Sequence, residues 1–310
     1  MAGHTSFALE PVPPFRLDLT VWVLRRRSDN VVDRWDGRTY RRVLAADGRE
    51  PFEMAVSQSG PPEAARLDVA VNCETLDRDI QETAMSALER LLGVGLDLED
   101  FYRRAEGDDE LRPLANQFRG FKPPRFQTYF ETLVNAIACQ QLTLTMGIRL
   151  LNSLAQVYGS PLRTEDGTFH AFPRPQDLAD ADLEDLRKIG FSYQKARYIT
   201  GLARSITAGQ FDLQEIELLD DKKAVDRLRS LKGVGRWTAE YFLLRGLGRT
   251  HMFPADDVGA RNNLQRWLGL SGAMDYDEVH SALKPWDGYG GLIYLHLLLK
   301  SLVEKGAMVI

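Results

Sequence analysis

The hydrophobic positions near the start of the chain recur at every second residue, which is the period of a half-buried β-strand. The alternation is clearest over residues 17–23, which read Leu-Asp-Leu-Thr-Val-Trp-Val. Further strand candidates follow at residues 39–44, 51–57 and 67–71. The pattern therefore predicts a strand at each of these places.

Turn and helix signals complete this first part of the chain. Asp-Gly pairs at residues 36–37 and 47–48 lie between the strand candidates and are typical of hairpin turns. Residues 80–92 have the spacing of a helix, and Gly93 closes it. We expect an α+β domain built on an antiparallel sheet over residues 1–112.

Helical periodicity replaces strand periodicity beyond residue 112. The segment 120–125 contains a Pro-Pro pair and cannot lie inside a helix. The spacing of one buried helix face then appears in Phe126, Tyr129, Phe130, Leu133, Val134 and Ile137. Similar stripes run through residues 146–158, 183–189, 195–206, 224–231, 237–244, 261–268 and 292–303. The pattern predicts an all-α region over residues 113–310.

One segment of this region is repeated. Gly190 precedes Ala196 by six residues, and Gly233 precedes Ala239 by the same distance. A tyrosine follows each alanine two residues later. Each copy has the pattern of a helix, a tight glycine turn and a second helix, which indicates a reused helix–hairpin–helix unit.

The charge of the chain is unevenly distributed. The net charge is −5, but residues 1–112 carry −7 (15 Lys+Arg against 22 Asp+Glu) and residues 113–310 carry +2 (24 against 22). Residues 222–249 hold eight basic side chains against two acidic ones. This local basic patch fits a solvated helix surface or a nucleic-acid contact equally well.

The second glycine turn has the composition of a phosphate-binding site. Its glycines let the backbone approach a ligand closely, and the helix that follows offers free N–H groups and the positive end of its dipole. Such a site binds the DNA backbone without reading sequence. The candidate residues are Lys232, Gly233, Val234, Gly235, Arg236 and Thr238.

Asp256 and Asp257 follow shortly before the next helical stripe. One aspartate at this position is expected as a helix N-cap, and capping does not need the second. A carboxylate at a helix start that faces a cleft stabilises a developing positive charge or orients a water molecule.

The segments Gly-Val-Gly-Arg-Trp-Thr-Ala (233–239) and Phe-Pro-Ala-Asp-Asp (253–257) together resemble the helix–hairpin–helix DNA glycosylases of base excision repair, closest to the 3-methyladenine DNA glycosylase II branch. The resemblance covers nearly the whole chain. It implies two helical subdomains with a DNA cleft between them, a hairpin at residues 228–243 and a catalytic loop at 251–258. It assigns the catalytic role to Asp257.

The resemblance also implies a monofunctional hydrolase. Relatives that act as lyases carry a lysine where this chain has Trp237, so an amine nucleophile is not expected. An alkylated purine is already cationic and leaves without a general acid, so that one carboxylate suffices. The implied base pocket is aromatic, with Trp237, Trp286 and Tyr289 as candidates. Ordinary core packing is an equal alternative for Trp286. Leu295, beside Tyr294, stands where relatives place a further aromatic residue.

A side chain must fill the gap that base flipping leaves in the duplex. The resemblance places this wedge in the loop of Gln140, Gln141 and Leu142, with Gln141 at the aligned position. A glutamine that caps a helix is the alternative interpretation.

The composition limits cofactors and location. Cys73 and Cys139 are the only cysteines, which excludes a disulfide framework, a cysteine zinc site and a four-cysteine iron–sulfur cluster. The resemblance implies at most a monovalent cation, Na⁺ or K⁺, at the hairpin carbonyls. The first residues lack a signal-peptide pattern and no apolar run would span a membrane, so we expect an intracellular protein, cytoplasmic or at the nucleoid in a prokaryote. The expected partner is double-stranded DNA with alkylated bases, bound by a monomer.

Two other function classes fit part of the pattern. A bifunctional glycosylase/lyase for oxidised purines would need the lysine that Trp237 replaces. A non-catalytic DNA-binding protein would not need Asp257 or an aromatic pocket. A dinucleotide-binding interpretation of the Gly-x-Gly turn fails because no strand precedes it.

Overall fold

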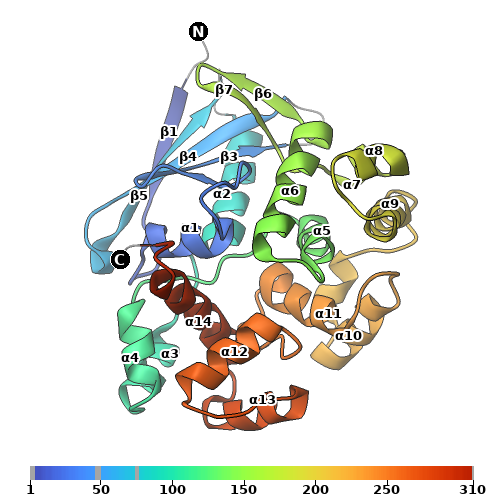
Figure 1. Cartoon of the computed structure of the whole chain (residues 1–310). Helices are drawn as coiled ribbons and strands as arrows, with labels where there is room; N and C mark the ends of the chain where they lie inside the picture. Colours follow the sequence, from blue (N-terminus) through green and yellow to red (C-terminus); the bar gives the residue numbers. More distant parts are fainter. Residues whose placement is uncertain (1–3, 46–49, 74–76, 309–310) are drawn as a thin grey trace.

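The computed structural model describes residues 4–45, 50–73 and 77–308. Its N-terminal part is a five-stranded antiparallel sheet of strand order β1-β5-β4-β3-β2 (Figure 1). The strands are β1 (His4–Leu9), β2 (Arg34–Trp35), β3 (Thr39–Leu44), β4 (Phe52–Ser59) and β5 (Arg66–Asn72). The predicted strands at 39–44, 51–57 and 67–71 are confirmed, and β1 and β2 were not predicted.

One face of the sheet packs against α1 (Leu17–Arg25) and α2 (Arg78–Leu92). Every second residue of β5, namely Leu67, Val69 and Val71, is fully buried there. The predicted helix at 80–92 is confirmed as α2, which ends at Gly93 with a φ of 61°. The predicted turn at 36–37 joins β2 to β3, and the Asp-Gly pair at 47–48 lies outside the described residues.

The strand predicted at residues 17–23 is wrong, because this segment forms α1. Leu17 and Val21 face the core under the sheet, whereas Leu19 and Val23 face a second core on the opposite side. Successive residues of a helix are 100° apart, so residues two apart lie on nearly opposite faces. A helix buried on both sides therefore shows the same alternation as a strand.

Helices form most of the remaining chain, as predicted. They are α3 (Glu99–Glu106), α4 (Leu111–Gln117), α5 (Tyr129–Cys139), α6 (Leu144–Tyr158), α7 (Pro175–Leu178), α8 (Leu183–Lys188), α9 (Tyr193–Thr207), α10 (Asp221–Arg229), α11 (Arg236–Phe242), α12 (Val258–Trp267), α13 (Tyr276–Leu283) and α14 (Gly290–Glu304). A π-helical turn at Leu243–Leu247 continues α11. One hairpin, β6 (Pro161–Thr164) and β7 (Gly167–His170), was not predicted, because its short strands bury no alternating face.

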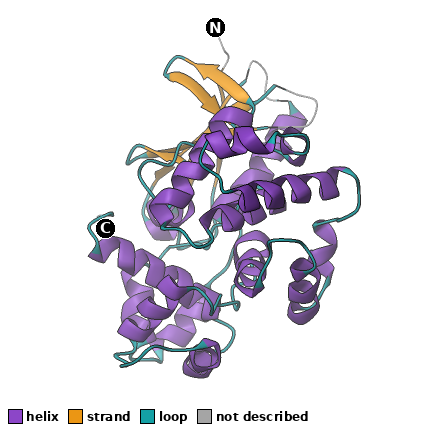
Figure 2. Ribbon diagram, turned by 45° about the vertical axis from the view of Figure 1, so that its right-hand side comes forward, coloured by secondary structure: helices purple, strands orange, loops and turns teal. Residues whose placement is uncertain are grey.

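Two hydrophobic cores divide these helices into two groups. One core joins α5, α6 and α8–α11, and the other joins α3, α4, α12 and α14 with one face of α1. Figure 1 shows the first group at the right in green to orange, and the second group below in teal and red. The strands gather at one end of the molecule (Figure 2). The expected domain boundary after residue 112 falls inside α4, whose apolar side chains pack in the second core.

A buried ion cluster connects the sheet to the helical region. The Arg42 guanidinium of β3 lies 2.7 Å from an Asp33 carboxylate oxygen and 2.6 Å from one of Glu131 on α5. The hydroxyl of Tyr40 also donates to Asp33, at 2.8 Å. Burial raises the pKa of Glu131, and the positive charge of Arg42 opposes that rise. The cluster holds α5, and therefore the loop that follows it, in position against the sheet.

Candidate functional site

The two copies of the repeated segment both form a helix, a glycine turn and a helix, as predicted. Gly190 between α8 and α9 has a φ of +107°, and Gly233 between α10 and α11 has a φ of +88°. The copies also contact each other. A Cβ on Gly233 would lie 2.3 Å from the ring of Tyr198 on α9, so only glycine fits at this close approach.

The start of the second helix of the unit differs between the copies. In the first copy, the Ser192 hydroxyl accepts a hydrogen bond from the Lys195 N–H at 3.3 Å and caps α9. In the second copy the N-cap of α11 is Gly235, which has no side chain. Gly235 is exposed, and a Cβ there would meet nothing within 4 Å. The second copy therefore presents its backbone to solvent.

The predicted hairpin residues divide into exposed and buried ones. Lys232, Gly235 and Arg236 are exposed, whereas Val234 and Thr238 are buried and anchor the turn. The carbonyl oxygens of Leu231 and Gly233 each accept a protein hydrogen bond, from the Val234 N–H at 3.2 Å and from Gln140 Nε2 at 2.8 Å. Each oxygen keeps a second lone pair for a further contact.

Asp257 is the N-cap of α12 and also accepts hydrogen bonds from two side chains. Its Oδ1 accepts from the Ala260 N–H at 2.9 Å, so it is the capping aspartate of the pair. Its Oδ2 accepts from the Tyr294 hydroxyl at 2.9 Å and from Trp237 Nε1 at 3.3 Å. Capping and lining the cavity are thus done by one carboxylate, and the three donors fix its orientation.

The position of Tyr294 depends on a close approach between α14 and the loop at residues 250–257, which precedes α12. The Leu292 N–H donates to the carbonyl oxygen of Thr250 at 3.0 Å. A Cβ on Gly291 would lie 2.7 Å from the carbonyl oxygens of both Thr250 and Met252. The glycine at the start of α14 therefore allows the loop to touch the helix, and Tyr294 lies one turn further along.

The neighbouring Asp256 belongs to a different set of contacts. Its carboxylate accepts from Arg236 at 2.7 and 3.0 Å, which joins the loop before α12 to the start of α11. The same guanidinium lies 3.6 Å from the ring centroid of Tyr276, whose hydroxyl donates to Glu240 at 2.6 Å. Burial is the main cause that raises the pKa of Glu240. Asp256 is thus paired, whereas Asp257 lines the cavity with no cationic partner among the described side chains.

A cavity of about 770 Å³ opens between the two helical groups, within the usual size of ligand pockets. The ring of Trp237 forms one of its walls, with that of Tyr241 stacked 5.3 Å away at 27°. The other polar or aromatic residues that line it are Arg26, Asn135, Cys139, Gln140, Gln141, Arg245, Asp256, Asp257, Asn262, Asn263, Arg266, Tyr294, Ser301 and Lys305.

Two predicted pocket residues lie outside this cavity. Trp286 is buried in the second core, 5.0 Å from the ring of Trp267, and its Nε1 donates to Asp108 at 2.9 Å. Tyr289 packs 5.7 Å from the ring of Phe101. The core-packing alternative for Trp286 is correct, because its indole contacts Trp267 of α12 and the loop between α3 and α4. Tyr294 provides the aromatic wall in place of these residues.

The predicted wedge residues differ in whether they form contacts within the protein. Gln140 is half-buried, and its Nε2 donates at 2.8 Å to both the Gly233 carbonyl oxygen and the Thr238 hydroxyl. Lys195 Nζ donates to the Gln140 carbonyl oxygen at 2.7 Å. Lys195 and Thr238 each lie five residues after the glycine of their copy, so equivalent positions of both copies hold Gln140.

Gln141 and Leu142 are the exposed residues of this loop. Gln141 has a φ of 53°, and 43% of Leu142 is exposed. Leu144 and Met146 extend the exposed apolar surface at the start of α6, at 36% and 43%. Of the three predicted wedge residues, Gln140 is engaged within the protein, and Gln141 and Leu142 are accessible to a duplex.

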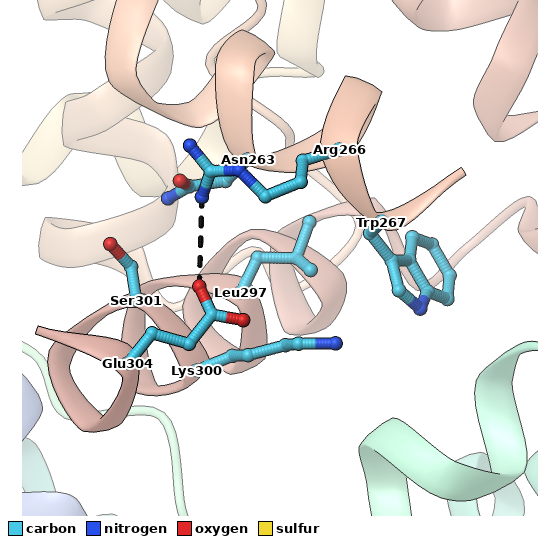
Figure 3. A pocket seen from close by; sticks show the side chains of 7 residues that line it. All are labelled: Asn263, Arg266, Trp267, Leu297, Lys300, Ser301 and Glu304. Atoms are coloured by element: carbon cyan, nitrogen blue, oxygen red, sulfur yellow. Dashed lines mark ion pairs between the residues drawn. The ribbon is translucent and has the colours of Figure 1, made fainter. Parts of the chain in front are cut away.

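A small pocket adjoins the large cavity between α12 and α14 (Figure 3). Asn263, Arg266 and Ser301 line both. The Arg266 guanidinium and the Glu304 carboxylate span it at 3.6 Å. Its volume of about 40 Å³ fits a water molecule and not a purine.

Arg26 and Arg245 are among the cavity residues that sequence reasoning missed. Neither has a local signal, because Arg26 reaches the cavity from the N-terminal part and Arg245 lies in an otherwise apolar helix. Within the described residues, no helix is both long and apolar enough for a membrane span.

Comparison with known families identifies the central part of this chain. Residues 134–287 match the model of the HhH-GPD superfamily of base excision DNA repair proteins. This segment contains both copies of the repeat, the predicted wedge loop and Asp257. It also agrees with the resemblance found in the sequence.

Individual relatives extend the similarity over most of the chain. The Escherichia coli protein named DNA-3-methyladenine glycosylase 2 is 27% identical over 283 residues, which cover 91% of this chain and 94% of that protein. The Bacillus subtilis protein named DNA-3-methyladenine glycosylase is 28% identical over 190 residues, 61% of this chain. The chain spans 59% and 63% of the length of two curated Bacillus subtilis relatives that it matches.

The fold has a close counterpart among solved structures. The 3-methyladenine DNA glycosylase from Archaeoglobus fulgidus superposes with a TM-score of 0.84 at 24% sequence identity, over 96% of this chain and 98% of that one. The predicted arrangement of a sheet domain followed by a helix–hairpin–helix region is confirmed.

Proposed function

We propose that this chain, which belongs to the HhH-GPD superfamily of base excision DNA repair proteins, is a monofunctional DNA glycosylase. It flips alkylated purines of the 3-methyladenine and 7-methylguanine type out of double-stranded DNA. It then hydrolyses the N-glycosidic bond and leaves an abasic site. The names of the relatives from Escherichia coli and Bacillus subtilis support this choice of substrate.

The observation that carries the proposal is the environment of Asp257. One carboxylate lines the cavity, and three hydrogen bonds fix it before any substrate binds. A preorganised negative charge stabilises the oxocarbenium-like sugar that forms as the base leaves. Because the carboxylate has about four acceptor positions and uses three, it retains one for the attacking water.

The mechanism needs no amine nucleophile. An alkylated purine carries a positive charge, so it leaves as a neutral base without a proton donor. The indole of Trp237 stands at the position of the lyase lysine. Together with the ring of Tyr241 stacked on it, the indole forms an electron-rich wall for a cationic base. We therefore expect an intact abasic site as the product.

The proposed DNA contacts surround the cavity. The open backbone at Gly235 and the exposed Lys232 and Arg236 would hold phosphates, and Gln141 with Leu142 would fill the gap in the duplex. We also propose that the protein acts as a monomer, without an iron–sulfur cluster or zinc, on chromosomal DNA inside the cell. A Na⁺ or K⁺ at the hairpin carbonyls would add to the phosphate contact.

The test is to incubate the protein with methylated duplex DNA, identify the released bases by chromatography and then treat the DNA with alkali. We expect free 3-methyladenine and 7-methylguanine, and strand breaks only after alkali. Covalent trapping of the protein on DNA by borohydride would contradict the monofunctional mechanism. A failure to release any methylated base would contradict the proposed activity.

A further inference from the structure

A lysine in the first copy of the repeat holds the chain where the wedge loop, residues 140–142, begins. Lys195 Nζ donates hydrogen bonds to the carbonyl oxygens of Ala138 at 2.8 Å and Gln140 at 2.7 Å. Both carbonyls lie at the end of α5, whose last residue is Cys139. A cation at this end of a helix is favoured by the helix dipole, and it satisfies carbonyl oxygens that the helix leaves unpaired.

The local sequence of α9 does not favour a lysine at this position. Lys195 is the third residue of the helix, and its backbone N–H donates to the Ser192 hydroxyl that caps α9. A capping box has glutamate or glutamine at this third position, and the positive end of the helix dipole opposes a cation there. Burial lowers the pKa of the Lys195 amine, and no carboxylate among the described residues opposes that shift. The partners of Lys195 are therefore the carbonyl oxygens of α5.

The second copy of the repeat also holds the wedge loop. Gln140 Nε2 donates at 2.8 Å to the Gly233 carbonyl oxygen and to the buried Thr238 hydroxyl. Thr238 has the same place in α11 that Lys195 has in α9, five residues after the glycine of its copy. Equivalent positions of the two copies thus bind the backbone and the side chain of the same residue.

The next residue, Gln141, has a backbone that requires such support. Its φ is 53°, in the left-handed region that residues other than glycine rarely adopt. A residue keeps this conformation only where the surrounding structure holds it. Gln140 fixes the chain before Gln141, and the Thr143 hydroxyl fixes it afterwards by accepting from the Met146 N–H at 3.3 Å. Gln141 and Leu142 are exposed between these two anchors.

We propose that Lys195 and Thr238 are positioning residues for base flipping, because they hold the wedge loop in the conformation that enters the duplex. This inference rests on the proposed function, in which Gln141 and Leu142 fill the gap left by the flipped base. A loop that is ordered before binding loses little conformational freedom on insertion, whereas a loosely held loop loses more. Lys195 does not line the cavity, so it acts through the loop and not on the base.

The test compares Lys195→Met with Lys195→Arg in the full chain. Methionine is of similar length and has no donor, whereas arginine keeps the charge and the donors. Single-turnover release of 7-methylguanine is measured from methylated duplex DNA and from the same strand alone. We expect Lys195→Met to be about 10-fold slower on the duplex, the cost of ordering about one more residue at insertion. The rate on the single strand should change by less than about twofold, because no flipping is needed. Lys195→Arg should restore most of the duplex rate.

A fluorescent base reports insertion of the wedge without any reaction. The probe is duplex DNA with 2-aminopurine beside an abasic-site analogue, because 2-aminopurine brightens when its stack opens. Lys188→Met is the matched control, since this exposed lysine of the same copy pairs with Asp185 at 2.6 Å, within α8. We expect the wild type and Lys188→Met to give the same fluorescence at saturating protein, and Lys195→Met to give less.

Thr238→Val is a second variant, which replaces the threonine by a side chain of the same shape. It removes the hydroxyl that accepts from Gln140 and leaves Lys195 in place. We expect the same selective loss on duplex DNA. This variant decides the question if Lys195→Met does not fold, with thermal unfolding as the check on both.

The outcomes separate this inference from the proposed function. Unchanged duplex rates, or equal slowing on duplex and single-stranded DNA, would show that these residues do not position the wedge loop. A lower affinity of Lys195→Met for undamaged duplex, with a weaker salt dependence, would show instead that Lys195 contacts a phosphate directly. Each of these results overturns the inference and leaves the proposed function standing. If the wild type releases no methylated base from either DNA, both fail.

Discussion

The hydroxyl of Tyr294 donates a hydrogen bond to Oδ2 of Asp257 at 2.9 Å. Burial raises the pKa of Tyr294 well above its usual value, and the negative charge of Asp257 raises it further. The phenol therefore keeps its proton and remains a donor throughout the neutral pH range. It connects α14 to the start of α12 across the wall of the cavity.

Tyr294→Phe should therefore slow base release while the protein still folds. The variant keeps the aromatic wall but loses a charge-assisted hydrogen bond, worth about 1.5–3 kcal/mol, or about 10- to 100-fold in rate if all of it orients the carboxylate. Single-turnover rates measure the effect. Tyr102→Phe is the matched control, since this buried phenol hydroxyl accepts from the Gly120 N–H, away from the cavity. Equal losses in both variants would assign Tyr294 to packing.

Asp257→Asn should remove most of the activity. Asparagine caps a helix almost as well as aspartate, so folding should persist, but it cannot supply the negative charge. Loss of one preorganised electrostatic interaction costs about 10²–10³-fold in rate. The variant should still bind an abasic-site analogue in a gel-shift titration.

Asp256→Asn is the control for that change. It weakens the partly exposed pair with Arg236, which is worth about 0–1 kcal/mol, and should leave the rate within a few-fold of wild type. Near-normal excision by Asp257→Asn, or a larger effect at Asp256, would remove the catalytic assignment.

Trp237→Ala should slow the release of cationic bases more than that of neutral ones. A cation over an aromatic face gains about 0.5–2 kcal/mol, whereas a neutral base loses only contact area. The ratio of 7-methylguanine to hypoxanthine release measures the difference. Trp237→Phe keeps a ring but loses the N–H to Asp257, and so separates the two roles of the indole. An unchanged ratio in Trp237→Ala would rule out the cation–π contribution.

Gln140 and Gln141 should respond differently to replacement by alanine. Gln141→Ala should slow excision from duplex DNA and have less effect on single-stranded DNA, which needs no flipping. Gln140→Ala should lower the free energy of unfolding by about 1–3 kcal/mol, because it leaves a buried hydroxyl and a carbonyl oxygen unpaired. Thermal unfolding and the ratio of duplex to single-strand rates distinguish them. An identical effect of Gln141→Ala on both substrates would place the wedge at Leu142.

Gly235→Val should weaken binding to every duplex alike without unfolding the protein. Its φ is −90° and a Cβ there meets nothing within 4 Å, so the fold accepts a side chain that a phosphate would not. Gel-shift titration at several salt concentrations should show a lower affinity and a weaker salt dependence. Gly201→Ala, on the exposed face of α9, is the control. Unchanged affinity in Gly235→Val would contradict phosphate binding at this turn.

Gly233 does not serve this test. A side chain there would collide with Tyr198, and its φ of +88° disfavours any other residue. Its replacement should destabilise the fold itself. The two glycines of the turn therefore have different reasons for being glycine, which their spacing in the sequence does not distinguish.

Local patterns were sufficient where one face of an element is buried. Strands β3, β4 and β5 alternate because one side of the sheet is solvated, and α2 begins and ends at residues that cap helices. The same rule failed for α1, because two cores bury opposite faces of that helix. The period of the hydrophobic positions indicates which faces of an element are buried. Burial depends on neighbouring elements, which the local sequence does not determine.

The sequence by itself determined the helix–hairpin–helix turn, the position of Asp257 before α12 and the lack of a lysine at Trp237, because each depends on residues close together along the chain. Only the tertiary structure decided which side chains share the cavity. Tyr294 lines the cavity, whereas Trp286 and Tyr289 do not, because the glycines that begin α14 let this helix touch the loop at residues 250–257. Arg26, which follows α1, lines the cavity because α1 packs between two hydrophobic cores. These contacts join segments that are far apart in the sequence, so they are determined by tertiary packing and not by local propensity.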